Sequence, residues 1–448
     1  MLSPEGKGIS RLKPAWPLLL HEIRSLLLSP ALWIMLVILS LLVGYSFLQA
    51  VELFSQASRT ALSFPELAGG MNPLDGIFVP AFGAYYLGET LLLPFIAIRL
   101  IGLDKQSGGL KLLLQLPFSP LFLCGLKMTA MGMIWLLSLV PAILVLLQWH
   151  LLGGHIYFPE VLLLFVGHGL YSFTVISIAM FAAAISDSLP TAAMFCLSIT
   201  LGSWVLDFAV TGQSGVLAGI GQFSLAGMLH QFESGLLATG DIAGFLSIAL
   251  IFFLLSVVWL HPGRHLRFKL AASFAVVGVM GFALMSSMYL PGYLDLSENN
   301  RHSFSPADSR ALAQLETPLI ITIHLNGRDS RLHDLQNGVL AKLLRTVPDL
   351  HVYYVATEDT GLFANGEDDK YGLLEYQYGG KNDESYSNSR EEMLPIIYKL
   401  AGMTVAADSK SNYKGYPLVA RAGRGQWLFY LFLPLLFLCA GLYSARRF

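Results

Sequence analysis

Two acidic residues lie inside long apolar stretches of this sequence. Glu89 and Asp207 each interrupt a run of residues that is otherwise hydrophobic enough to cross a bilayer. Because a charged group at the bilayer centre costs about 2.5–3.5 kcal/mol on insertion scales, neither side chain is expected to face lipid. Both carboxylates are therefore expected to face protein or water. Hydrogen bonding to a neighbouring helix would explain them, with Tyr85, Tyr86 and Ser203 as candidate donors.

Other motifs that carry chemistry are missing from the sequence. No G-x-x-x-x-G-K-[ST] motif occurs, so the chain is not expected to cradle nucleotide phosphates in the P-loop manner. The histidine pairs His150 with His155 and His261 with His265 are not accompanied by the cysteine or carboxylate ligands that would complete a metal site. We therefore expect no enzyme activity, no metal site and no cofactor in this chain.

The composition is that of a membrane protein. Hydrophobic residues make up 54% of the 448 residues and charged residues only 13%, against roughly 25% charged in a soluble domain. The net charge of −2 argues against nucleic acid as a partner. The three cysteines all lie in or beside apolar runs, so no disulfide framework is expected.

Eight apolar runs are long enough to cross the roughly 30 Å hydrocarbon core of a bilayer. They lie at residues 31–50, 78–98, 129–148, 161–185, 191–210, 242–260, 270–290 and 427–443. Residues 15–28 precede them and form an amphipathic helix suited to the membrane interface. The Gly-rich stretch 211–240 is expected to form helices that dip into the membrane without crossing it.

These features predict an α-helical polytopic membrane protein with a small α/β extracytoplasmic domain. The expected parts are an N-terminus with an interfacial helix (1–30), a six-span domain (31–262), a seventh span (263–291), the α/β domain (292–425) and an eighth span with a short basic tail (426–448). Lys and Arg are concentrated in the N-terminus, in the loops around residues 99–120 and 261–269, and at the C-terminus. By the positive-inside rule both termini are cytoplasmic and residues 292–425 lie outside.

The loop at residues 99–120 has an unusual pattern for a segment exposed to water. Ser107 is placed to cap a short helix, and Leu110, Leu113 and Leu114 then form one apolar stripe at helical spacing. The stripe either docks a partner or lies on the lipid surface.

Sequence around this loop resembles the ABC type-2 exporter permeases. The shared features are Asp104, the pair Gly108-Gly109, the exit Pro117-Phe118-Ser119-Pro120, and Gly125-Leu126-Lys127 opening the next span. In that family the loop contacts the ATPase subunit. The resemblance implies a coupling role for Asp104, Lys105, Gln106, Leu110, Leu113 and Leu114. It also makes Glu89 and Asp207 candidates for a translocation path, because the second and fifth spans line that path in the family, and the hydrogen-bonding explanation carries equal weight.

The segment 292–425 is polar and carries its own secondary-structure signals. Strands are predicted at 318–325, 351–356 and 371–378, and helices after Ser305, from Leu332 to Leu344 and from Ser389 to Leu400. Residues 294–306, 390–392 and 415–418 resemble the external domain of the gliding-motility auxiliary ABC proteins. The chain therefore resembles a fusion of a permease with a shortened auxiliary domain.

The resemblance implies the permease subunit of an ATP-driven ABC exporter in the bacterial inner membrane. It would act as a homodimer with two copies of a separate ATPase that binds ATP and Mg. An alternative is a non-transporting envelope machine, in which the ATPase moves residues 292–425 against a periplasmic partner. A third, an ion-coupled transporter using Glu89, would not need a docking loop. The sequence does not identify a substrate.

Overall fold

The computed structural model of the protein describes residues 15–115, 117–210, 221–261, 263–287, 290, 292–326, 329–355, 370–405 and 413–446. The predicted polar N-terminus up to residue 14 and residues 211–220 of the predicted re-entrant stretch therefore lie outside the described residues.

Within those ranges, eight helical segments are long and apolar enough to cross a membrane, which confirms a multi-pass helical protein. The first four are α3 (Pro30–Ser63), η2 with α4 (Leu74–Phe78 and Val79–Ser107), α6 with α7 (Pro120–Ser138 and Val140–Leu151) and α8 (Phe158–Ile185). The next three are α9 (Leu189–Val210), α12 (Thr239–Leu260) and α13 (Leu266–Ser287). The last combines α18 (Gly423–Trp427), η4 (Leu428–Phe432) and α19 (Leu433–Arg446).

Several predicted helix ends are wrong, mostly in the direction of longer helices, although α13 ends at Ser287, before the predicted 290. The predicted loop 51–77 is mostly helical, because α3 continues to Ser63 and a 3-10 helix, η1, covers Pro65–Gly70. The second span runs on from the predicted end at 98 to Ser107, and Gly108 ends it with a φ of 79°. The third span starts at Pro120, not 129, because Ser119 accepts a hydrogen bond from the Phe122 N–H and caps the helix.

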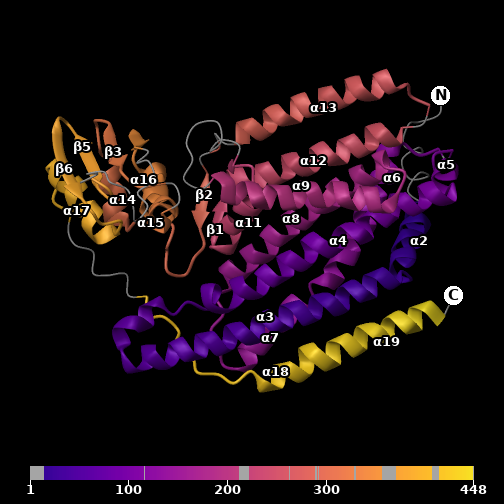
Figure 1. Cartoon of the computed structure of the whole chain (residues 1–448), viewed down its shortest axis with the longest axis horizontal. Coiled ribbons are helices and arrows are strands. Elements are labelled where there is room, and N and C mark those ends of the chain that lie inside the picture. The colour runs from indigo at the N-terminus through magenta and orange to yellow at the C-terminus, as the bar shows by residue number, and fades with distance from the viewer. Residues whose placement is uncertain are drawn as a thin grey trace, which may run out of the picture.

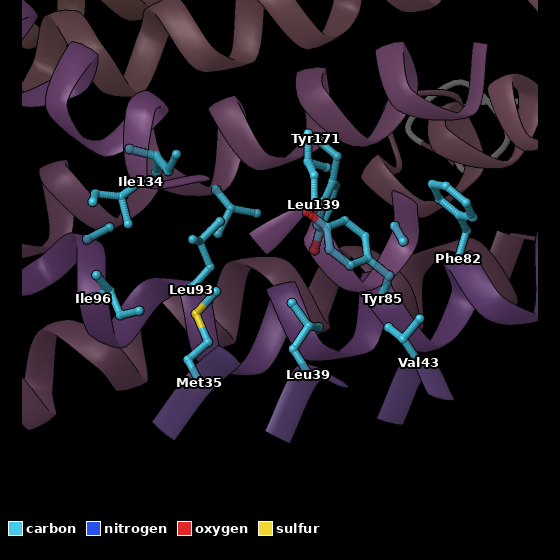
Figure 2. Close-up of a cluster of buried hydrophobic side chains, with 14 of the residues drawn as sticks. Met35, Leu39, Val43, Phe82, Tyr85, Leu93, Ile96, Ile134, Leu139 and Tyr171 are labelled. Carbon is cyan, nitrogen blue, oxygen red and sulfur yellow. The ribbon is translucent and has the colours of Figure 1, made fainter. Parts of the chain in front are cut away.

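Helix α4 lies at the centre of the bundle and packs against α3, α8 and α9. Figure 2 shows the α3 face of Met35, Leu39 and Val43 opposite the α4 face of Phe82, Tyr85, Leu93 and Ile96. Gly88 permits this close approach, because a Cβ there would lie only 2.5 Å from Leu39 Cδ1. The spacing of these two helices therefore depends on a missing side chain.

Helix α11 (Leu225–Glu233) occupies the end of the predicted re-entrant stretch. Ser224 caps it by accepting a hydrogen bond from the Gly227 N–H, and its buried side chains pack on α8 and α9. A short strand follows, β1 (Leu236–Ala238), which pairs antiparallel with β2 (Tyr293–Asp295) after α13. This two-stranded sheet was not predicted, since neither strand is longer than three residues.

A four-stranded sheet in the order β4-β3-β5-β6 forms a separate core. β3 (Leu319–Ile323) pairs parallel with β4 (Leu350–Tyr354) and antiparallel with β5 (Leu374–Tyr378). β3 and β5 fall within predicted strands, and β4 begins one residue before its predicted strand. The edge strand β6 (Lys381–Ser385) was missed because its sequence, Lys-Asn-Asp-Glu-Ser, has no apolar alternation. The helices here are α14 (Pro306–Ala313), α15 (Ser330–Leu335), η3 (Gln336–Leu340), α16 (Ala341–Thr346) and α17 (Arg390–Ala401).

The sheet and the short helices α2 (Ala15–Leu27) and α5 (Gly109–Leu113) lie at opposite ends of the long bundle (Figure 1). The C-terminal end of α19 lies at the same end as α2 and α5 (Figure 1). We call this the α5 end, and the other the sheet end.

This arrangement predicts labelling from opposite sides of the membrane. In a cysteine-free variant, Leu112→Cys in α5 and Asn382→Cys in β6 each place a thiol on an exposed position. A membrane-impermeant maleimide should label only one of them in sealed right-side-out vesicles and only the other in inverted vesicles. Labelling of both from the same side would contradict an arrangement in which the bundle spans the bilayer end to end.

Candidate functional site

A buried ion cluster joins three helices at the α5 end. Lys127 of α6 lies 2.6 Å from a carboxylate oxygen of Glu22 in α2 and 2.6 Å from one of Asp104 in α4. The same ammonium group donates a hydrogen bond of 2.8 Å to the Leu100 carbonyl. Lys127 is 3% exposed and Glu22 6%. The cluster therefore connects the interfacial helix α2 to the end of the central helix α4.

Sequence reasoning missed this cluster because its members lie far apart in the chain. Glu22 was treated as part of an amphipathic surface helix, and Lys127 was placed at the opening of the third span, just before its predicted start at 129. The longer α6 brings Lys127 into the bundle, where burying a cation without a partner would cost several kcal/mol. That cost is the signal that predicts an acidic partner for any lysine just inside a membrane helix.

Lys105 ties the same end of α4 to the turn between α8 and α9. Its Nζ donates hydrogen bonds to the carbonyls of Ala184 (3.3 Å) and Ser186 (2.8 Å) and lies 2.9 Å from Asp187 Oδ1. A cation at the C-terminus of a helix satisfies free carbonyls and interacts favourably with the helix dipole. Lys105 thus makes contacts within the chain, while Gln106 is exposed.

The predicted leucine stripe faces the protein more than the solvent. Leu110 packs against the bundle core, and Leu113 and Leu114 are half-buried. Leu112, which the sequence analysis did not single out, is 67% exposed. Ser107 is the last residue of α4, where its Oγ accepts a 3.3 Å hydrogen bond from the Gly109 N–H, and not the cap of a separate helix.

Glu89 is fully buried in the middle of the bundle and is held by hydrogen bonds. Trp135 Nε1 donates to Oε1 at 2.7 Å, Ser172 Oγ donates to Oε2 at 2.6 Å, and Ser138 Oγ lies 3.4 Å from Oε1. Of the predicted donors, Tyr85 is linked to the carboxylate only indirectly. Its hydroxyl lies 2.8 Å from Ser138 Oγ, the same atom that lies 3.4 Å from Glu89 Oε1.

The other two predicted donors make no hydrogen bond to Glu89 among the described residues. The Ser203 Oγ accepts a hydrogen bond from the Leu225 N–H in α11, and the Tyr86 ring packs against Tyr171. The actual donors come from α6 and α8, so Glu89 joins α4 to both of these helices.

A histidine lies beside this network. His168 is completely buried, its ring is 5.5 Å from that of Tyr85, and its Nε2 lies 3.3 Å from Glu233 Oε1. His230 Nδ1 lies 3.6 Å from the other oxygen of Glu233. Burial raises the pKa of the Glu233 carboxyl, but the neighbouring His168 and His230 outweigh burial and hold that pKa at about 2. Glu233 therefore stays ionised between the two imidazoles.

Asp207 is not part of the Glu89 network. Its carboxylate lies against α11, where a Cβ at Gly227 would be 2.6 Å from Asp207 Oδ1. The two acids predicted to share a path thus face different helices, with Glu89 toward α6 and α8 and Asp207 toward α11. Whether either lines a translocation path stays a prediction.

A second polar cluster lies at the sheet end, where the chain enters and leaves the four-stranded sheet. Arg301 Nη1 lies 2.7 Å from Asp75 Oδ1 of η2. Glu298 accepts a hydrogen bond from Tyr416 (2.7 Å) and lies 2.9 Å from His155 Nε2. The rings of His155 and Tyr416 are stacked with centroids 3.6 Å apart. These contacts, which we call the junction, fix both connecting segments to the bundle.

Removing Lys127 should destabilise the protein strongly. Lys127→Met leaves Glu22 without its cation, and breaking a buried ion pair from one side costs about 3–5 kcal/mol. Unfolding titrations in mixed micelles measure this loss, with the exposed Lys111→Met as the matched control. Adding Glu22→Gln to Lys127→Met should recover part of the loss. Equal effects of the two lysine changes would contradict the cluster.

Glu89 should tolerate an amide better than a hydrocarbon. Glu89→Gln keeps an acceptor for Trp135, and Ser172 can reverse its hydrogen bond, so the midpoint of thermal unfolding should stay near that of the unaltered protein. Glu89→Leu leaves buried donors unpaired and should cost about 0.6–2 kcal/mol, the range for polar contacts between membrane helices. Equal stability of both variants would show that these hydrogen bonds contribute nothing.

Comparison with known proteins gives no relative for this arrangement. No family model matches the chain, no curated protein matches it, and no solved structure matches its fold.

Proposed function

We propose that this chain is the membrane subunit of an ATP-driven machine, in which a separate ATPase docks at the α5 end. The observation that carries the proposal is one continuous helical segment, Leu74–Ser107, that joins the two polar clusters. Asp104 near one end belongs to the Lys127 cluster, and Asp75 near the other is ion-paired with Arg301 at the junction.

Length and packing suit this segment to transmit movement. Its 34 residues span about 50 Å at 1.5 Å per residue, enough to cross the whole bilayer. Displacement of the α5 end is passed along the helix because its backbone hydrogen bonds resist compression, and Pro94, which lacks one of these bonds, is the position where the helix can bend. Movement at Asp104 would therefore reach Arg301, and with it the chain that leads into the four-stranded sheet.

The surface of the α5 end supports docking of a partner. Leu112 offers a large exposed apolar side chain, and Gln106 and Lys111 beside it are exposed and polar. An apolar anchor surrounded by polar residues is the usual composition of a protein interface. In this proposal the ATPase, present in two copies, supplies the ATP and Mg.

We further propose a homodimer in the bacterial cytoplasmic membrane, with the α5 end cytoplasmic and residues 292–425 forming an extracytoplasmic α/β domain. Helix α9 supports the dimer, because Met194, Leu201 and Val205 are 66%, 37% and 58% exposed on it. A second copy in the membrane would cover such a surface by van der Waals packing.

The junction favours a second candidate function, a machine that moves its external domain without transporting a substrate. Both segments that flank the four-stranded sheet are fixed to the bundle through Arg301, Glu298 and Tyr416. Movement of the bundle would then be delivered to the sheet and to any partner bound there. A transporter needs no such double attachment.

Capture of the partner tests the docking assignment. The tagged protein purified from native membranes should bring down an ATPase subunit, and Leu112→Asp should abolish this because it places a charge in the apolar contact. Leu344→Asp is the matched control, since Leu344 is 59% exposed but lies in α16 at the sheet end.

Retention of the ATPase by Leu112→Asp, or its equal loss from both variants, would contradict docking at α5.

The second candidate function adds one expectation. The same purification should recover an extracytoplasmic protein, and Leu344→Asp should leave the ATPase in place whether or not that protein is lost. Substrate-dependent stimulation of ATP hydrolysis by the purified complex would instead favour transport.

A further inference from the structure

A cavity at the α5 end combines groups that bind anions with apolar walls. It has a volume of about 450 Å³ and lies between α2, the start of α3 and the end of α4. Its basic lining residues are His21, Arg24 and Arg99. Its acidic ones, Glu22 and Asp104, share one cation, Lys127, and Arg24 and Arg99 then leave an excess of positive charge around the cavity. The cavity therefore has room for a polar headgroup and cations to receive it.

Ser29 gives the cavity a built hydrogen-bonding position. It is only 7% exposed, it lines the cavity, and its Oγ makes no hydrogen bond with any described residue. It also stands at the N-cap of the 34-residue helix α3, yet its side chain does not cap that helix. A buried hydroxyl without a partner costs about 1–3 kcal/mol, so a ligand oxygen here is favoured.

Helix α3 adds a favourable electrostatic environment. The first residue of α3 is Pro30, which has no N–H, and the Leu32 N–H donates to the Ser29 carbonyl, so the helix contributes chiefly the positive end of its dipole. Phosphate groups are favoured at such positions. Arg99 also lines the cavity, is half-buried and has no hydrogen-bond or ion-pair partner among the described residues. The N-terminus of α3, Ser29 and Arg99 thus converge on one space.

We propose that this cavity binds the phosphate of an anionic phospholipid headgroup. Its apolar walls, which include Leu28 and Leu103, suit a lipid better than a free inorganic ion. Helix α2, which forms one side, exposes Trp16 by 63%, and tryptophan is enriched where helices meet the membrane interface. The bound lipid would fill the space between α2 and α4 beside the Lys127 cluster. This site needs no ATPase, so its test is independent of the proposed function.

Equilibrium binding of a phosphatidylglycerol with a fluorescent acyl chain to the purified full chain in neutral detergent tests the site. Phosphatidylglycerol should bind at least tenfold more tightly than phosphatidylcholine with the same fluorescent chain. Arg99→Gln should weaken binding roughly tenfold and Ser29→Ala roughly threefold, as expected for a charged and a neutral hydrogen bond. Arg264→Gln, which removes one charge from the loop between α12 and α13, should change binding less than twofold.

Three results would overturn the proposal. Equal weakening by Arg99→Gln and Arg264→Gln would show general attraction to positive charge. Equal binding of the two lipids would show that the headgroup charge is not recognised. Displacement by inorganic phosphate as effective as displacement by unlabelled lipid would make this a site for free anions. If Arg99→Gln does not fold, as judged by its elution volume, the exposed Arg24→Gln replaces it with the same expected loss.

Discussion

The position of the central helix depends on one buried lysine. Lys127 is the common partner of Glu22 and Asp104, and it brings together three helices that are otherwise separated in the sequence. Glu22 is buried and Asp104 keeps part of its hydration, so the shared ammonium group compensates the buried Glu22 and reduces the repulsion between the two carboxylates. Its further hydrogen bond to the Leu100 carbonyl fixes the lysine to α4 itself. Displacement of α2 or α6 therefore acts directly on α4.

Whether an element of the fold could be predicted from the sequence depends on how far apart in the chain the residues that determine it lie. Hydrophobic runs located all eight spans, because burial in a bilayer is decided over about 20 neighbouring residues. Helix ends were wrong where capping decides them, as at Ser119 and Gly108, because polar residues beyond the apolar run were assigned to loops. The edge strand β6 has no apolar pattern at all and exists only because β5 offers it a partner.

At the candidate site, too, patterns among neighbouring residues could be predicted, but contacts between residues far apart in the chain could not. The sequence indicated that Glu89 faces protein or water and not lipid, and the structure buries its carboxylate fully within the protein. It could not indicate Trp135 and Ser172 as donors, because they lie on other helices, at distances of 46 and 83 residues along the chain. The leucine stripe of the loop was identified by its spacing, yet Leu110 packs inward and Leu112 is exposed. Periodicity shows that a helix has an apolar side but not which surface covers that side.

Packing indicates which helices would move together. Gly88 and Gly102 of α4 lie in direct contact with Leu39 of α3 and Leu189 of α9, so a side chain at either glycine would clash. Helices packed this closely cannot slide past each other without opening the core, and α3, α4 and α9 are therefore expected to shift as one block. Helix α13 differs, because Ser287 is its one buried residue among those described. It packs along α12, and its ends are further held by the Lys269 hydrogen bond to the Trp259 carbonyl and by the pairing of β2 with β1. A movement of α12 would therefore carry α13 with it, while the block of α3, α4 and α9 is held together by its own close contacts.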